Sequence, residues 1–260
     1  MNMNNNKLCV SACIVTYNDS SKALKTIESI ILNTTGVKLD FYVSDNASQD
    51  DFPKKIKNMF PNITVIENKK NGGFGFAHNK IIDRINSDYH AIINPDILID
   101  SDVLTDLCNF LEEHKDVVMV TPKILSIDGT EQHLPKLQPK LKYMLASRIP
   151  ALKSFRSEYT RQNDNISKPC EIDFCTGCFM LIRTSVFKQL GGFDERFFMY
   201  MEDADLTRRA KKFGKVMFIP QIHVTHLWER SSSKNFKYLL IHVFSMFKFF
   251  FKYAFNKEKY

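Results

Sequence analysis

Three features are absent from the sequence, and each absence argues against a class of protein. No run of about 18 uncharged apolar residues occurs, so a membrane-spanning helix is not expected. Residues 1–7 lack the apolar core of a signal peptide, so the chain is expected to stay in the reducing cytosol. No internal repeat and no low-complexity tract appears. These absences point to a globular protein that does not cross the membrane.

The cysteines lack the spacing of a zinc site or a disulfide framework. Six are present, and only Cys175 and Cys178 form a CxxC pair, with no second pair at zinc spacing. The flanking residues are apolar and typical of a strand. We interpret these cysteines as buried side chains without a redox or metal role, since free cysteine behaves as a small hydrophobe.

Composition and charge indicate one large globular unit with an anionic partner. Of the 260 residues, 44% are hydrophobic and 25% are charged, which is ordinary for a soluble domain. The formal net charge is +7, and part of the excess is concentrated. Residues 136–161 carry seven basic side chains and one acidic one, and residues 234–260 carry six lysines and one glutamate. We expect both stretches to face something negative.

The first 122 residues alternate between strand-like and helix-like segments. The expected strands are 8–15, 39–43, 63–67, 89–93 and 117–121, and the expected helices are 22–33, 51–59, 76–85 and 103–113. Continuous apolar runs are typical of a parallel sheet that is buried on both faces. The alternation predicts the nucleotide-binding half of an α/β fold.

Polar clusters follow four of these strands. They are Thr16–Asp19, Ser44–Ser48, Asn71–Gly75 and Asn94–Asp96. Ligands of open α/β sheets bind at the carboxyl ends of the strands, so the placement itself is informative. The glycine-rich cluster precedes an expected helix whose N-terminal amides would suit a phosphate, and a plain turn is the alternative explanation.

The second half has a less regular pattern. Residues 126–172 predict a loop with short helices, followed by a strand at 174–183, a helix at 185–190 and a strand at 216–219. His223 and His226 come next on an extended segment and face opposite sides, so at most one reaches a given cleft. A structural role is the alternative for either histidine.

Three carboxylates, Glu202, Asp203 and Asp205, lie at the expected start of another helix. Helix N-termini favour negative charge, so they could be ordinary first-turn residues, and a catalytic cluster is the other interpretation. Residues 236–255 are the most apolar segment, edged with lysine. They suit an interfacial helix on an anionic membrane or a helix docked on the core.

Together these motifs resemble the family 2 glycosyltransferases, and within them the rhamnosyltransferase-like branch that builds bacterial O-antigen and capsule polysaccharides. The likeness covers roughly residues 8–233. The matching motifs are Ile14–Asn18, Val43–Ser48, Asn71–Gly75 followed by Asn79, Asn94–Asp96, Thr176–Phe179 and Phe198–Leu206. The last of these is the branch's most specific motif.

The resemblance implies an α/β fold with a mixed, mostly parallel central sheet flanked by helices. It would be a single nucleotide-diphospho-sugar transferase domain of the A type over residues 1–233, with a nucleotide-binding half at 1–122 and an acceptor-binding half at 123–233. Residues 234–260 would form a basic aromatic tail, for which a membrane-interfacial position is one of the two interpretations.

The implied activity is inverting transfer of a sugar from a nucleoside diphosphate donor, with dTDP-rhamnose favoured. A lipid-linked saccharide would be the acceptor, at the cytoplasmic face of the membrane with peripheral contact. Mg²⁺ or Mn²⁺ would be the cofactor. The alternatives are a UDP-hexose or galactofuranosyl transferase of the same family and a non-catalytic nucleotide-sugar binding subunit.

The resemblance also assigns residues to roles. Asp203 would be the catalytic base beside Glu202, and Gly177 and Glu202 would contact the acceptor. The donor would contact Thr16, Tyr17, Asn18, Asp45, Asn46, Gly72, Gly73, Asn79, Asn94, Pro95 and Asp96. Asp96 and His226 would hold the metal. Asn94 is a departure, because the family usually carries Asp-x-Asp there.

Glu202 and Asp205 would raise the proton affinity of Asp203, whereas the helix N-terminus would lower it. Two other functions fit less well. A nucleotidyltransferase usually has a glycine-rich loop with arginine after its first strand, and Thr16–Asp19 is no such loop. A nucleic-acid binder would suit the charge, but no known binding module is present.

Overall fold

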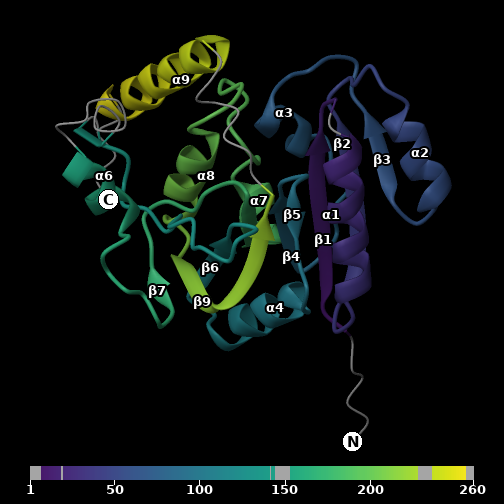
Figure 1. The fold of residues 1–260 in the computed structure, drawn as a ribbon, viewed down its shortest axis with the longest axis horizontal. Helices are drawn as coiled ribbons and strands as arrows, with labels where there is room; N and C mark the ends of the chain where they lie inside the picture. The colour runs from purple at the N-terminus through teal and green to yellow at the C-terminus, as the bar shows by residue number, and fades with distance from the viewer. Residues whose placement is uncertain (1–6, 19, 141, 144–152, 228–235, 256–260) are drawn as a thin grey trace, which may run out of the picture.

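The computed structural model describes residues 7–18, 20–140, 142–143, 153–227 and 236–255. Its centre is a nine-stranded sheet in the order β3-β2-β1-β4-β8-β6-β9-β5, and β7 also pairs with β9 (Figure 1). The strands are β1 Cys9–Thr16, β2 Lys38–Asp45, β3 Thr64–Glu67, β4 Tyr89–Ile93, β5 Ile97–Leu98, β6 Val117–Leu125, β7 Cys170–Glu171, β8 Phe179–Arg183 and β9 Lys215–His226.

The sheet is mixed, and most of its strands run in one direction. β3, β2, β1 and β4 are parallel neighbours, while β8 is antiparallel to both β4 and β6. β6 therefore runs in the same direction as β4, since both are antiparallel to β8. β9 shares this direction because it is parallel to β6. In register, Ile14 at the centre of the sheet pairs with Val43 and with Ile93. The expected fold class is confirmed.

Helices cover both faces of this sheet. They are α1 Ser20–Asn33, α2 Phe52–Met59, α3 Phe74–Asn79, α4 Val103–Glu113, α6 Lys153–Thr160, α7 Thr184–Gln189, α8 Glu202–Ala210 and α9 Phe236–Phe255. On one face, α1, α2 and α4 bury side chains such as Ile27, Ile56 and Leu107 against the strands. On the other face, residues of α7 and α8 pack with the segment after α3. Each fully buried aliphatic or aromatic side chain stabilises the fold by roughly 1.5–3 kcal/mol relative to exposure.

Four elements differ from their expected limits by more than two residues. β6 continues to Leu125 rather than to residue 121, and β9 spans Lys215–His226 rather than residues 216–219. α3 begins at Phe74 and ends at Asn79, and the chain to Ile85 continues in tighter turns, with Ile82 N–H donating to the carbonyl of Asn79 at 3.1 Å. β8 begins at Phe179 rather than at residue 174. Within residues 175–178, two amides bond to α8 instead of to a strand. Cys175 N–H donates to Thr207 Oγ1 at 3.2 Å, and Gly177 N–H donates to Asp203 Oδ2 at 3.1 Å. Both cysteines of the CxxC pair are buried and free.

A third apolar cluster joins α9 to the rest of the molecule. It contains Phe197, Ala204 and Phe249 and lies beside α8, and α9 runs along the outer side of that helix (Figure 1). Within the described ranges, no helix has an apolar stretch long enough to cross a bilayer. The expected division between residues 122 and 123 falls at an irregularity within β6. The expected boundary between residues 233 and 234 lies outside the described residues.

Candidate active site

The ends of β1 and β2 bring the first two polar clusters together. Thr16 Oγ1 donates to Asp45 Oδ1 at 3.0 Å, and Ser48 donates to the same carboxylate through its hydroxyl at 2.5 Å and its backbone N–H at 2.9 Å. Asn46 N–H donates to the carbonyl of Thr16 at 2.8 Å. The adjacent turn places Asn18 at a positive φ, and its N–H bonds to Ser48 Oγ at 3.0 Å. Tyr17 is exposed.

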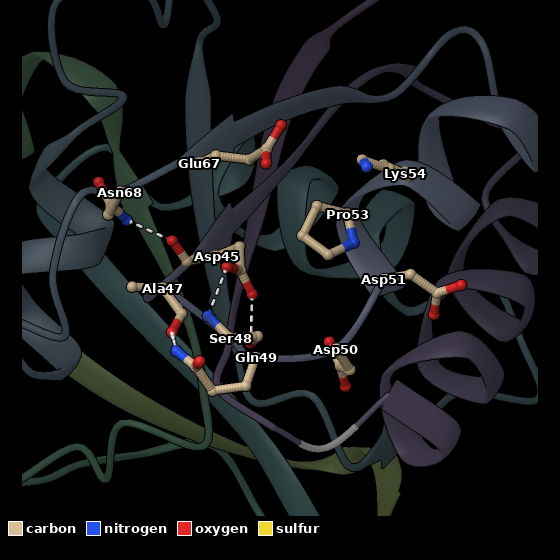
Figure 2. Close-up of a pocket in the computed structure, with 10 residues that line it drawn as sticks. All are labelled: Asp45, Ala47, Ser48, Gln49, Asp50, Asp51, Pro53, Lys54, Glu67 and Asn68. Carbon is tan, nitrogen blue, oxygen red and sulfur yellow. Dashed lines mark hydrogen bonds between the residues drawn. The ribbon is translucent and has the colours of Figure 1, made fainter.

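A hollow of about 460 Å³ opens beside Asp45 (Figure 2). Its lining residues are Asp45, Ala47, Ser48, Gln49, Asp50, Asp51, Pro53, Lys54, Glu67 and Asn68. Four of them are carboxylates and one is a lysine. Carboxylates accept hydrogen bonds from hydroxyl and N–H groups and repel phosphate. The hollow therefore suits the ribose and base of a nucleotide better than its phosphates.

The glycine-rich turn packs closely against the segment that carries the carboxylate motif. Gly73 has a φ of 95°, and a Cβ there would lie 2.0 Å from the carbonyl oxygen of Phe198. Gly73 N–H donates to Asn71 Oδ1 at 3.0 Å, and Phe74 N–H donates to Phe198 O at 3.0 Å. These two amides are engaged by the protein itself, so a packing turn accounts for the glycines. Donor contacts of Gly72 and Gly73 stay a prediction.

Two of the expected donor contacts have structural partners. The Asn79 amide bonds to both backbone groups of Phe193 and donates to Glu195 Oε1 at 3.0 Å. The Asn46 amide donates to Gly73 O at 3.0 Å. Asn79 links α3 to the segment around Phe193, and Asn46 links the end of β2 to the glycine turn. Contact of either side chain with the donor stays a prediction.

The fourth polar cluster, Asn94–Asp96 at the end of β4, meets the end of β9. Asn94 N–H donates to Cys178 O at 2.9 Å, and Pro95 O accepts from Thr26 Oγ1 at 2.9 Å, so the backbone here is held on two sides. Asp96 Oδ1 lies 3.1 Å from His226 Nε2, because β5 pairs antiparallel with β9 directly after Asp96.

Asp96 and His226 could supply two of the ligands of a divalent metal ion. His226 Nδ1 lies 3.0 Å from Gln132 Oε1, which can only accept, so Nδ1 donates there and Nε2 is the ring nitrogen that faces Asp96. Asp96 Oδ1 is buried without a hydrogen bond from any other described residue. Within the described ranges no three His, Cys, Asp or Glu side chains gather around one point. One carboxylate and one imidazole fit Mg²⁺ or Mn²⁺ if the substrate supplies the remaining oxygens.

The carboxylate motif forms the first turn of α8, as expected. Asp203 Oδ2 accepts from Gly177 N–H at 3.1 Å, and Oδ1 accepts from Ala204 N–H at 2.8 Å. Glu202 is buried, and its Oε2 atom has no hydrogen bond within the described chain. Tyr200 and Met201 before the helix both have positive φ values, 69° and 70°, which indicates a strained entry into α8.

Burial raises the pKa of the Asp203 carboxyl above its ordinary value, while Lys136 and the N–H groups of Gly177 and Ala204 oppose that rise. Burial also raises the pKa of Glu202 well above the ordinary range, and the charge of Asp203 adds to this effect. Lys136 Nζ lies 4.9 Å from the centroid of the Phe174 ring. Two adjacent carboxyls with raised proton affinity, under the influence of the partly buried Lys136, are typical of acid–base sites.

The Asn94–Asp96 cluster and the carboxylate motif of α8 meet around residues 177 and 178. Gly177 touches Asp203, Cys178 O accepts from Asn94, and the charges of Lys136, Asp96 and Asp203 all act on the Cys178 thiol. Burial is the largest effect on this thiol and raises its pKa to about 12. The site therefore lies on the edge of the sheet where β1, β2 and β4 end.

Comparison with known protein families shows which family the chain belongs to. The sequence profile described as "Glycosyl transferase family 2" matches residues 11–191, well over half of the chain. The chain belongs to this family. This family 2 glycosyltransferase is 26% identical over 241 residues to the N-acetylglucosaminyl-diphospho-decaprenol L-rhamnosyltransferase of Mycobacterium tuberculosis, an alignment that covers 85% of this chain and 76% of the relative. It is 28% identical over 167 residues to rhamnosyltransferase WbbL of Escherichia coli K12, covering 60% of this chain and 61% of that one.

A solved structure supports the fold. GalNAc-T7, determined with UDP, GalNAc and Mn²⁺, superposes with a TM-score of 0.66 at 16% identity over 87% of this chain. The family 2 chain spans 45% of that protein. At this identity the likeness shows the fold, a single A-type nucleotide-sugar transferase domain, and nothing more.

One expectation about the carboxylate motif of this glycosyltransferase is wrong. Asp205 was expected to act on Asp203, but its carboxylate points to α9, where Oδ1 accepts from Lys252 Nζ and from Tyr253 OH at 2.6 Å. Its Oδ2 accepts from Arg209 Nε at 2.7 Å. The pKa of Asp203 is raised mainly by burial. The charge of Asp205 is compensated by two cations, Arg209 and Lys252, and by the hydroxyl of Tyr253.

The structure adds residues that the sequence patterns did not single out. Gln132 orients His226 across 94 positions of the chain, and Lys136 approaches Asp203 from the irregular middle segment. No local pattern marks either residue. Ser48 could have been found, because a serine three positions after an aspartate commonly closes a turn on its carboxylate. Of the two histidines, His226 is buried at the site and the His223 side chain is 44% exposed.

Proposed function

We propose that the protein is an inverting glycosyltransferase that moves a sugar from a nucleoside diphosphate donor to a hydroxyl of a lipid-linked saccharide. The observation that carries the proposal is the environment of Asp203. Its carboxylate has a raised pKa, lies at the carboxyl edge of the sheet and is held by Gly177 N–H. It is therefore suited to take a proton near the point where the donor binds.

The reaction needs a proton acceptor at the attacking hydroxyl. The Asp203 carboxylate removes the hydroxyl proton, the oxygen forms a bond to the anomeric carbon, and the bond from that carbon to the diphosphate oxygen breaks. The leaving nucleoside diphosphate keeps the electron pair, and attack from the opposite face inverts the anomeric centre. Gly177 N–H and Ala204 N–H hold the base in place. A positioned general base contributes roughly 10²- to 10⁴-fold in rate.

The leaving diphosphate needs neutralisation. Asp96 and His226 would hold a divalent cation, which supplies positive charge to the phosphate oxygens when it is bound. Gln132 fixes the His226 ring so that Nε2 faces the site. Mn²⁺ in the GalNAc-T7 structure supports a divalent ion in this fold. Thr16, Asn18 and Asp45 would hold the nucleoside beside the acidic hollow.

Two relatives support the choice of sugar and acceptor. Both are named rhamnosyltransferases, and the mycobacterial enzyme is named for an acceptor in which N-acetylglucosamine is joined through a diphosphate to decaprenol. We therefore propose dTDP-rhamnose as the donor and a polyprenyl-diphosphate saccharide as the acceptor. Such an acceptor would place the protein at the cytoplasmic face of the membrane, in peripheral contact with it.

The test is release of nucleoside diphosphate from a panel of dTDP-, UDP- and GDP-sugars, with and without Mg²⁺ or Mn²⁺. A bacterial membrane extract supplies acceptors. The expected result is release from one donor, dependent on both the extract and the metal. Nucleotide binding without release from any donor would contradict the enzymatic proposal and favour a binding subunit.

A further inference from the structure

Helix α9 has two distinct faces, and its inner face is bound to the segment that leads into α8. Ser245 Oγ donates to Met199 O at 2.7 Å, Phe249 is 1% exposed, and Tyr253 OH donates to the buried Asp205 at 2.6 Å. These three residues are four positions apart and so share one side of the helix. The helix is therefore docked on the catalytic domain, as one of the two interpretations of this segment predicts.

The outer face of α9 carries a stripe of large apolar side chains. They are Phe236, Leu240, Phe244, Phe247 and Phe251, with exposed fractions between 42% and 72%. Their spacing of three or four positions places them together along the full length of the helix, about 30 Å at 1.5 Å per residue. Single exposed apolar residues are ordinary on protein surfaces, whereas a contiguous stripe indicates an interaction site.

The surroundings of this stripe are basic. Lys237 and Lys248 are exposed beside it, with Lys248 Nζ also donating to Arg196 O at 2.8 Å, and α9 contains no aspartate or glutamate. A groove of about 410 Å³ opens next to it, lined by Phe198, Ile241, Phe244, Ser245 and Lys248. Apolar rings edged by ammonium groups complement the interface of an anionic membrane, where negatively charged headgroups overlie the acyl chains.

We propose that the outer face of α9 is a membrane-docking face, which lies in the headgroup region of a bilayer that contains anionic lipid. The phenylalanine rings enter the acyl boundary, and the lysines contact the phosphates. A second protein copy fits less well, because a stable interface needs roughly 20–30 residues on each side and this stripe is one face of one helix.

The docked helix would set the distance of the active site from the bilayer. α9 contacts Met199 and Asp205, which flank Glu202 and Asp203 in the sequence, so the base lies close behind the membrane-facing helix. The inference goes beyond the proposed reaction, because vesicle binding needs neither donor nor acceptor.

The test is flotation of the purified full chain with vesicles. One set contains equal parts phosphatidylglycerol and phosphatidylcholine, and the other contains phosphatidylcholine alone. The variant Leu240→Gln/Phe244→Gln/Phe247→Gln should bind the anionic vesicles at least about a hundredfold more weakly, since each buried apolar side chain contributes about tenfold or more. Glutamine is a good helix former, so α9 should persist. Lys237→Gln should weaken binding to the anionic set alone, by about fivefold.

A matched control is Leu32→Gln/Ile127→Gln, which removes two apolar side chains that are each 76% exposed elsewhere on the surface. This control should float as the wild type does. The inference is overturned if the wild type does not float, if the triple variant floats equally well, or if the triple variant instead loses a concentration-dependent dimer. Flotation of Asp203→Asn at the wild-type level would separate this result from any failure of the proposed reaction.

Discussion

Asp203→Asn is the substitution that most sharply separates the proposed chemistry from a structural role. Asn keeps the size of the side chain and one acceptor oxygen, and it cannot take a proton at neutral pH. In the structure the Asp203 carboxylate accepts one N–H from Gly177 and one from Ala204, at 3.1 and 2.8 Å. The asparagine can keep one of these bonds, and the α8 N-terminus is otherwise unchanged.

The expected magnitudes differ strongly between activity and stability. Loss of a general base lowers the rate by roughly 10²- to 10⁴-fold, which corresponds to about 3–5 kcal/mol of barrier. Loss of one hydrogen bond costs about 1 kcal/mol of unfolding free energy. Burial disfavours the ionised carboxylate, as the raised pKa of Asp203 shows, so removing its charge offsets part of that cost. We therefore expect an unfolding free energy within about 1 kcal/mol of the wild type.

The assay is acceptor-dependent release of nucleoside diphosphate as a function of pH, together with urea denaturation. The raised pKa means that the wild-type rate climbs with pH as Asp203 loses its proton, and the climb occurs above the pH range of an ordinary aspartate. The variant should lack this climb. The control is Asp116→Asn. Asp116 directly precedes β6, and its carboxylate pairs with Lys215 at the edge of the sheet opposite the candidate site. Turnover near the wild-type level in Asp203→Asn would refute the assignment of the base.

Three further substitutions have definite expected outcomes. Gln132→Leu removes the acceptor of His226 Nδ1, so Mn²⁺ affinity in the presence of dTDP should fall about 10- to 100-fold in calorimetry. Lys136→Met removes a positive charge that lowers the pKa of Asp203, so the pH–rate profile should move to higher pH, and Lys136→Arg should restore it. Asp205→Asn breaks a buried charge network and should lower the unfolding free energy by about 3 kcal/mol in urea.

Each of these expectations has a contradicting result. Unchanged Mn²⁺ affinity in Gln132→Leu would mean that the glutamine does not orient a ligand, and Gln132→Glu serves as the variant that keeps an acceptor. An unshifted profile in Lys136→Met would mean that the ammonium is too distant to act on the base. A loss below about 1 kcal/mol in Asp205→Asn, no more than that of the exposed Asp116→Asn, would show that α9 is not clamped through this carboxylate.

The alternating half of the fold was predictable because its signals are local. β1 and β4 are continuous apolar runs, and the polar residues that follow them emerge on one edge of the sheet by the geometry of parallel strands. The expected limits of β8 were wrong for a non-local reason. Residues 175–178 look like a strand in sequence, but the amides of Cys175 and Gly177 donate to side chains of α8, 32 and 26 positions away in the chain.

The candidate site was predictable in part. The proximity of Asp96 to His226 depends on pairing between β5 and β9, and the motif likeness alone suggested it. The direction of Asp205 was not predictable, because its partners Lys252 and Tyr253 lie on the last helix. The same contacts show that the inner face of α9 is docked on the domain. The apolar outer face of the helix is revealed only by the exposed fractions of its side chains.

Sugar transfer from dTDP-rhamnose to a lipid-linked acceptor can be followed directly with a labelled donor. The purified protein is incubated with dTDP-[¹⁴C]rhamnose, Mn²⁺ and a synthetic polyprenyl-diphospho-N-acetylglucosamine, and the lipid fraction is separated by chromatography. We expect label in a lipid product of slower mobility, formed by the wild type and not by Asp203→Asn. Label that remains in dTDP-rhamnose or appears only as free rhamnose, while a UDP- or GDP-sugar gives no lipid product either, would contradict this expectation.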